Sequence, residues 1–417
     1  MTTSTSGQDL PLSFTDLCKR IFLGKPLTSE QLESQRLSNS VALGALSPDA
    51  ISSTAYGPEQ IMIELLPYAG MAAFALLLPI TGVILLILLL VTLSYRGVVT
   101  AYARSGGSYM VARDNFGPRV AQIAAAALLI DYVVTVAVQP AAGTVAVVSA
   151  IPPLRPYHLE ITVATVLLIC FANLRGLRQS GRVFAITTYS FVVMIMLTII
   201  TGLVREVFGG LPKYDPQHIA GAVPVHQGNG LVMGATIFVV LRAFANGGSS
   251  LTGVEAISNT IDVFRAPQSL NARRVLTAMA GILGFLLIGV GWLAYVTHAT
   301  PYVDEYPSML SEIARAVFGH GLIGDVLYFL VQASTAAILF TGCNTSFNGF
   351  PALSSFVAQD RFLPRPLTKR GHRLVFSNGI MLLTTLAVAL LLITGGSVHG
   401  LIPLFAIGAF LAFTLSQ

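Results

Sequence analysis

The chain has 417 residues, of which 54% are apolar and only 10% are charged, with a formal net charge of +5. A mean hydropathy of +0.74 excludes a soluble globular domain, and several apolar runs reach the ~20 residues that a bilayer-spanning helix needs. We therefore expect an all-α polytopic membrane protein, because a membrane-spanning barrel shows weaker, alternating segments. Its expected partner is the lipid bilayer, and nucleic acid is not expected.

Residues 1–40 are polar and contain no apolar core followed by a cleavage site, which predicts a cytoplasmic leader rather than a signal peptide. Ten spans are predicted at about 43–66, 71–95, 117–150, 157–174, 183–208, 231–264, 275–298, 321–348, 375–394 and 398–416. With the N-terminus inside, 19 of the 24 Lys and Arg residues fall in inner segments and 4 in outer segments. This asymmetry predicts a multi-pass protein of the cell (inner) membrane with a cytoplasmic N-terminus.

The first predicted span is interrupted by polar residues over 47–57. It contains the carboxylate of Asp49, followed by hydroxyl residues that include Tyr56. Carboxylates are costly inside a membrane and by default indicate function, so the segment is interpreted as a broken helix that lines a site. The alternative is that Asp49 only caps a half-helix that begins near Ala50, and the two roles are compatible.

The third predicted span contains a polar stripe. Asp131, Thr135 and Gln139 are spaced i, i+4, i+8 and therefore share one helical face, with Tyr132 beside it. An acid, a hydroxyl and an amide can replace the oxygen shell of a small cation, and a carboxylate held in low dielectric can also carry a proton. The alternative is a hydrogen-bond network that only holds the bundle together.

The sixth predicted span is interrupted over 246–256, a stretch that holds three glycines, two serines, a threonine and a carboxylate. Glycine weakens a helix, and backbone released from a helix must be satisfied by protein, ions or water. We expect this break to contact the ligand through Thr252 and through the backbone of Asn246, Gly247, Gly248 and Ser249.

Arg242 lies four residues before this break, at membrane depth, and therefore needs a partner. Its expected candidates are Glu255, Asp49 and Asp131, in a role that is either a structural salt bridge or part of a gate.

Breaks in corresponding positions of two halves are typical of secondary transporters. They predict a first repeat of spans 1–5 over residues 41–210, an outer linker over 211–229, and a second repeat of spans 6–10 over 230–417.

Enzyme chemistry is not indicated. Cys18, Cys170 and Cys343 are scattered and odd in number, without the spacing of a metal site. The histidines lie at span ends or in loops, so no nucleophile and base are brought together in sequence. We expect no enzyme activity and no cofactor.

Six short stretches carry a family likeness that covers about residues 15 to 417. They are residues 20–27, 47–57, 105–109, 131–138, 251–259 and 344–351. Together they resemble the Kim-type potassium importers of the amino acid–polyamine–organocation (APC) superfamily. This resemblance implies a 5+5 inverted-repeat bundle with broken helices 1 and 6, which takes up potassium with protons by alternating access.

The resemblance also implies which residues surround the ions. Potassium ligands are expected at Tyr56, Asp131, Thr135 and Thr252, with Tyr132 beside them and Asp49 as the proton carrier. The chain departs from the family pattern in two places. Gln139 stands where the family has a serine, and Phe405 stands where it has a tyrosine.

Family members continue into two more spans and a soluble domain, so the chain is expected to be truncated before further spans. The main alternative is a proton- or cation-coupled amino-acid permease, whose broken helices would bind the carboxylate and amine of an amino-acid-like solute. A transporter-like nutrient sensor without flux is a second alternative. The expected partners are thus potassium or a small amino-acid-like solute, and protons, with a homodimer left open.

Overall fold

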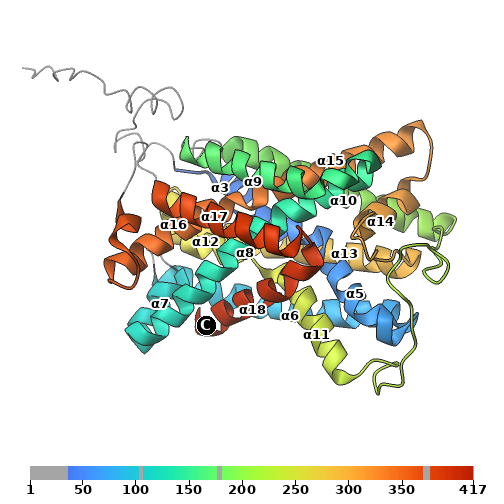
Figure 1. Ribbon diagram of the computed structural model, residues 1–417, viewed down its shortest axis with the longest axis horizontal. Helices are drawn as coiled ribbons and strands as arrows, with labels where there is room; N and C mark the ends of the chain where they lie inside the picture. The colour runs from blue at the N-terminus through green and yellow to red at the C-terminus, as the bar shows by residue number, and fades with distance from the viewer. Residues whose placement is uncertain (1–35, 103–106, 176–180, 370–375, 417) are drawn as a thin grey trace, which may run out of the picture.

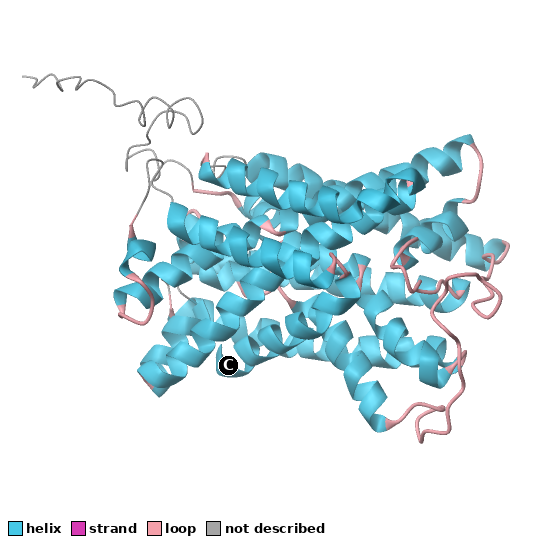
Figure 2. Ribbon diagram, in the orientation of Figure 1, coloured by secondary structure: helices cyan, strands magenta, loops and turns pink. Residues whose placement is uncertain are grey.

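The computed structural model of the chain describes residues 36–102, 107–175, 181–369 and 376–416. Within these ranges all regular elements are helical (Figure 2), and β-structure is limited to isolated bridges. This confirms the all-α expectation. Most of the predicted leader 1–40 lies outside the described residues, as do the stretch 20–27 and residues 105–106.

Seven helical segments in the described part of the chain are long and apolar enough to cross a membrane. They are α6 (Ala72–Ala101), α8 (Pro118–Ala150), α9 (His158–Leu174) with its leading turn η2 (Pro152–Tyr157), α10 (Gly181–Phe208), α13 (Gln268–Thr297), α15 (Leu322–Gly342) with its continuation α16 (Asn344–Gln359), and α17 (Ser377–Thr394). Two shorter helices, α11 (Ile237–Gly247) and α18 (Val398–Ser416), are apolar as well.

Both predicted interruptions are present as breaks between short helices. The first segment consists of α3 (Asn39–Leu46), α4 (Pro48–Ser52), the 3₁₀ turn η1 (Ser53–Ala55) and α5 (Gly57–Ala69). The second consists of α11, the 3₁₀ turn η4 (Gly248–Leu251), α12 (Ala256–Asn259) and η5 (Ile261–Val263). Residues 252–255 between η4 and α12 are not helical, and Gly253 has a φ of +80°, which only glycine adopts without strain.

The two ends of the bundle differ, and most long helices run from one end to the other, across the view of Figure 1. The loops 209–236 and 298–308 pair with each other at one end through the bridge between Ala222 and Tyr302. We call this the loop end, and it also holds α14 (Met309–Phe318). The opposite end holds α7 (Gly107–Phe116) and η6 (Arg365–Thr368).

Helix α8 passes through the centre of the molecule. It packs against α18, α15, α16, α9, α17 and α7, while α6 pairs with α13 and α5 with α11 (Figure 1). The polar stripe that the sequence places on α8 is therefore held inside the bundle, and the lipid-facing surface is left to apolar side chains of helices such as α6, α9 and α10.

Two predicted span boundaries were wrong. The sixth span does not begin at residue 231, because residues 230–235 form two isolated bridges, Gly230 with Gly234 and Val232 with Ala235, and the helix begins at Ile237. The eighth span does not end at residue 348, because α16 continues the path of α15 to Gln359.

Candidate functional site

The first break and the polar stripe of α8 meet in a buried hydrogen-bond network. The side-chain amide of Gln139 donates to Oδ1 of Asp49 over 2.7 Å, and its carbonyl oxygen accepts from the hydroxyl of Ser52 over 2.9 Å. Asp49 is 4% exposed and Gln139 is fully buried. Gln139 thus joins α8 to both ends of α4.

A third segment completes the surroundings of Asp49. The hydroxyl of Thr345, at the start of α16, donates to Oδ2 of Asp49 over 3.2 Å. Gly253 lies against the same carboxyl group, since a Cβ atom there would come within 2.8 Å of the carboxyl carbon. The two breaks therefore touch each other at Asp49.

Three buried carboxylates cluster at this point. Asp131 lies close enough to Asp49 and Glu255 for their charges to interact, and Glu255 interacts with Asp49 in the same way. Oδ1 of Asp131 and Oε2 of Glu255 are buried and have no hydrogen-bond partner. No ion pair within the described residues involves any of the three acids. Such a cluster is costly unless a proton or a cation compensates it.

Two tyrosines flank the cluster. The hydroxyl of Tyr56 is buried without a hydrogen-bond partner, and it lies beside Thr252 and within electrostatic reach of Asp49 and Asp131. The hydroxyl of Tyr132 accepts a hydrogen bond from the side-chain amide of Asn259 on α12 over 3.0 Å. Tyr132 therefore links α8 to the second break by a hydrogen bond, and Tyr56 of the first break lies beside Thr252 of the second.

The other predicted site residues make hydrogen bonds mostly to residues three or four positions away in the sequence. Thr135 donates to the carbonyl oxygen of Asp131 over 2.9 Å, and Thr252 donates to that of Ser249 over 2.9 Å, so both hydroxyl oxygens keep lone pairs for a ligand. The hydroxyl of Ser249 donates to the carbonyl oxygen of Asn246 over 2.6 Å. Gly247 packs against Ile61 and Ile84, and Gly248 packs against the ring of Phe410.

The expected partners of Arg242 were wrong. Its guanidinium pairs with Glu64 on α5 over 3.1 Å, and the other oxygen of Glu64 accepts from the side-chain amide of Asn246 over 2.8 Å. The Arg242 side chain is 54% exposed, so it is not the isolated buried charge that the hydropathy pattern indicated. Asn246 thereby contacts this pair, whereas the carboxylate cluster has no ion-pair partner in the part of the chain that the structure describes.

Two cavities approach the cluster from opposite ends. A small cavity of about 20 Å³ on the side of the loop end is lined by Tyr56, Glu59, Gln60, Glu305, Thr335 and His399, among others. A cavity of about 230 Å³ on the other side is lined by Tyr132, Asn259, Asn348 and Gln359, among others. Each cavity is lined by one of the two tyrosines, and none of the three carboxylates lines either cavity.

Three further polar side chains lie at the cluster or in a cavity beside it, and the sequence did not predict them there. Glu255 is expected from the sequence only as a partner for Arg242, although it is itself a carboxylate within the second break. Thr345 was noted only as one of several small polar residues near the end of span 8. Glu59 was missed, although a carboxylate that closely follows a break within an apolar segment is itself a signal.

Comparison with known proteins gives two matches. The amino acid permease family matches residues 49–417. The chain is also 42% identical over 399 residues to the potassium transporter KimA of Bacillus subtilis (strain 168), an alignment that covers 96% of this chain. The chain spans 63% of the length of that relative. The resemblance expected from the six sequence stretches is confirmed.

Proposed function

We propose, since this chain belongs to the amino acid permease family, that it is a multi-pass secondary transporter which takes up potassium together with protons. The observation that carries this proposal is the cluster of Asp49, Asp131 and Glu255, which is buried and has no cationic side chain among the described residues. Hard cations are bound by oxygen ligands. The name of the related potassium transporter supports potassium as the cation.

The residues around the cluster have distinct proposed roles. Asp131, Tyr56, Thr135 and Thr252 surround the potassium ion, with Tyr132 beside it. The unpartnered oxygens of Asp131 and Tyr56 support this assignment, because an ion supplies the interaction that the protein does not.

Asp49 is the proposed proton carrier. When it gains a proton it exchanges the charge-assisted bonds from Gln139 and Thr345 for weaker ones. Its protonation therefore alters how α4 is held against α8 and α16. Gln139 is proposed to hold Asp49 in position, and the break at 246–251 is proposed to contact the ion through its backbone.

The proposed architecture is a 5+5 inverted repeat of ten spans, with α3 to α10 forming the first repeat and α11 to α18 the second. The matching breaks at the start of each half support it. The excess of Lys and Arg in the predicted inner segments supports a cytoplasmic N-terminus, which makes the loop end extracellular. Alternating access then exposes the carboxylates to the two cavities in turn.

An amino-acid permease is the second candidate, and the description of the family favours it. The non-helical backbone at 252–255 offers the amide and carbonyl groups that an amino-acid ligand needs. A nutrient sensor of the same fold would bind its ligand without flux.

The test is proton uptake into proteoliposomes that contain the protein, followed with a trapped pH dye. Potassium is added first and an amino-acid mixture second. We expect a potassium-dependent signal that Asp131→Asn abolishes, because the amide removes the negative charge that compensates the cation. Asp114→Asn, which neutralises an exposed carboxylate on α7, is the matched control and should leave the signal unchanged.

A signal that depends only on amino acids would contradict potassium transport and support the permease. Binding of either ligand without any proton movement would favour the sensor. A potassium-dependent signal that survives in Asp131→Asn would contradict the assigned ion site.

A further inference from the structure

The cavity at the loop end contains a carboxylate that the proposed transport site does not use. Glu59 is 4% exposed, it lines the cavity, and its Oε1 atom has no hydrogen-bond partner. The backbone N–H of Met309 at the start of α14 lies against its carboxylate, and the charged groups that act on it are the carboxylates of Glu305 and Glu312, which have the same sign. A buried carboxylate in such surroundings requires a proton or a cation to compensate it.

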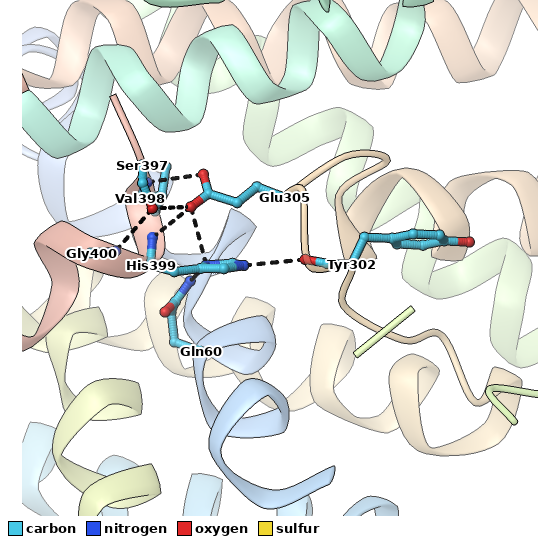
Figure 3. A network of polar contacts seen from close by, with 7 residues as sticks. All are labelled: Gln60, Tyr302, Glu305, Ser397, Val398, His399 and Gly400. Carbon is cyan, nitrogen blue, oxygen red and sulfur yellow. Dashed lines mark hydrogen bonds and ion pairs between the residues drawn. The ribbon is translucent and has the colours of Figure 1, made fainter. Parts of the chain in front are cut away.

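The polar and charged side chains at the rim of this cavity bind to one another and to nearby backbone groups. Figure 3 shows the carboxylate of Glu305 at the start of α18, where it accepts from the hydroxyl of Ser397 and from the backbone N–H groups of Val398 and His399, the latter two over 2.9 Å. The ring of His399 lies 3.8 Å from Glu305 and 3.2 Å from the side-chain amide of Gln60. Glu305 is therefore satisfied by groups at the start of α18, and the ring of His399 contacts Glu305 and Gln60.

The rest of the cavity offers oxygen atoms. The unpartnered hydroxyl of Tyr56 lines it, and Thr335 lines it with a hydroxyl whose proton is donated to the carbonyl oxygen of Val331 over 2.7 Å. Ser308 and the side-chain amide of Gln60 complete the polar lining. Within the described residues no group of three His, Cys, Asp or Glu side chains could hold a metal ion. The lining thus favours a monovalent cation over a divalent metal.

We propose that this cavity is a second cation site, in which Glu59 and Tyr56 bind a monovalent cation before it enters the carboxylate cluster. The inference rests on the proposed potassium transport. Tyr56 belongs to both places, because it lines the cavity and its hydroxyl lies within electrostatic reach of Asp49 and Asp131. A cation leaving Glu59 therefore keeps one oxygen ligand while it exchanges the others. The contact between the side chains of Gln60 and His399 lies at the rim of this cavity.

The test is potassium binding to the purified protein in detergent, measured by calorimetric titration with KCl against a background of N-methylglucamine chloride. We expect two classes of site in the unchanged protein. Glu59→Gln, which keeps the shape of the side chain and removes its charge, should remove one class, and Asp131→Asn should remove the other. In proteoliposomes Glu59→Gln should raise the half-saturating external potassium concentration on the order of tenfold.

Glu160→Gln is the matched control, because Glu160 is an exposed carboxylate in the first turn of α9 and lines neither cavity. It should bind potassium as the unchanged protein does. If Glu59→Gln does not give a monodisperse protein, Thr335→Val removes a lining oxygen at constant shape and should weaken the same class of site several-fold.

The second site would be overturned if the protein had a single class of potassium site that Asp131→Asn removes, and if Glu59→Gln and Thr335→Val did not change potassium binding. The proposed function would then remain intact. A protein that binds no potassium at all would overturn both.

Discussion

At the scale of single residues, the site depends on one neutral side chain. Gln139 donates to Asp49 and accepts from Ser52, so it uses both ends of its amide at a fully buried position. A serine at this position would be too short to reach both partners. The longer side chain therefore fixes the distance between α8 and α4 as well as the orientation of the carboxylate.

Replacement of Gln139 by leucine should test this dependence. Gln139→Leu leaves Oδ1 of Asp49 without a partner, which costs about 1–3 kcal/mol for a buried group, while the hydroxyl of Ser52 keeps its bond to the carbonyl oxygen of Asp49. We expect a lower thermal midpoint in detergent and a loss of at least about tenfold in potassium-dependent proton uptake, by the usual conversion of 1.4 kcal/mol per factor of ten.

Gln217→Leu is the control for the Gln139 variant, since it makes the same change at an exposed position in loop 209–236. Equal behaviour of the two variants would show that the Gln139 bonds contribute nothing to the site.

At the scale of elements, the breaks and the polar stripe could be predicted because their residues are incompatible with lipid. Asp49, Asp131 and the glycine-rich stretch 246–256 each violate the apolar pattern around them, and the structure buries all three together. The residues at which the spans begin and end could not be predicted equally well. Residues 230–235 are apolar enough for a span but form bridges, and hydropathy alone does not distinguish the two.

Pairing between elements was not predictable either. Arg242 and Glu64 are far apart in the sequence and meet only because α5 packs against α11. A single sequence gives no information on which helices are neighbours, so it could not identify Glu64 as the partner of Arg242.

The loop end offers an element whose stability depends on pH. Glu312 on α14 accepts hydrogen bonds from the backbone N–H of Thr300 over 2.8 Å and from the hydroxyl of Tyr302 over 2.6 Å, so it holds loop 298–308 on the bundle. Burial raises the pKa of Glu312 from 4.5 to about 7, against the opposing effect of these two bonds.

Because this pKa is higher in the folded protein than in the unfolded chain, the folded state binds the extra proton between pH 4.5 and about 7. The stabilisation, up to about 3 kcal/mol, is complete below pH 4.5 and is lost as the pH rises through 7. We expect the thermal midpoint to fall over this range, and Glu312→Gln to remove that part of the slope. Glu160→Gln should keep the slope, and an unchanged slope in Glu312→Gln would assign it to other groups.

At the scale of the whole molecule, the site is closed at both ends. Asp49, Asp131 and Glu255 are at most 4% exposed, and none of them lines either cavity. The loop end is closed where Gln60 of α5 meets His399 of α18, and the opposite end is held by Asp360, which pairs with Arg113 of α7 over 3.0 Å. Transport requires these two closures to open in turn.

Permanent closure of the loop end should therefore stop transport. In the double variant Gln60→Cys, His399→Cys, a short bis-methanethiosulfonate reagent is expected to reduce potassium-dependent uptake to the level of empty liposomes, and reduction should restore it. Each single variant treated in the same way is the control. Uptake that continues in the cross-linked protein would mean that the cation does not pass between α5 and α18.

The grouping of Asp49, Asp131 and Glu255 also has an electrical consequence. Together they bear at most three negative charges, and in the proposed transport each potassium ion or proton that they accept cancels one of them. A site in which all three charges are cancelled is neutral, so the membrane voltage does no work on it. An uncancelled charge gains or loses about 2.3 kcal/mol per 100 mV. In that case the membrane voltage acts only on the step in which the empty site returns. The charge moved per transport cycle then equals the number of these three acids that are ionised during the return.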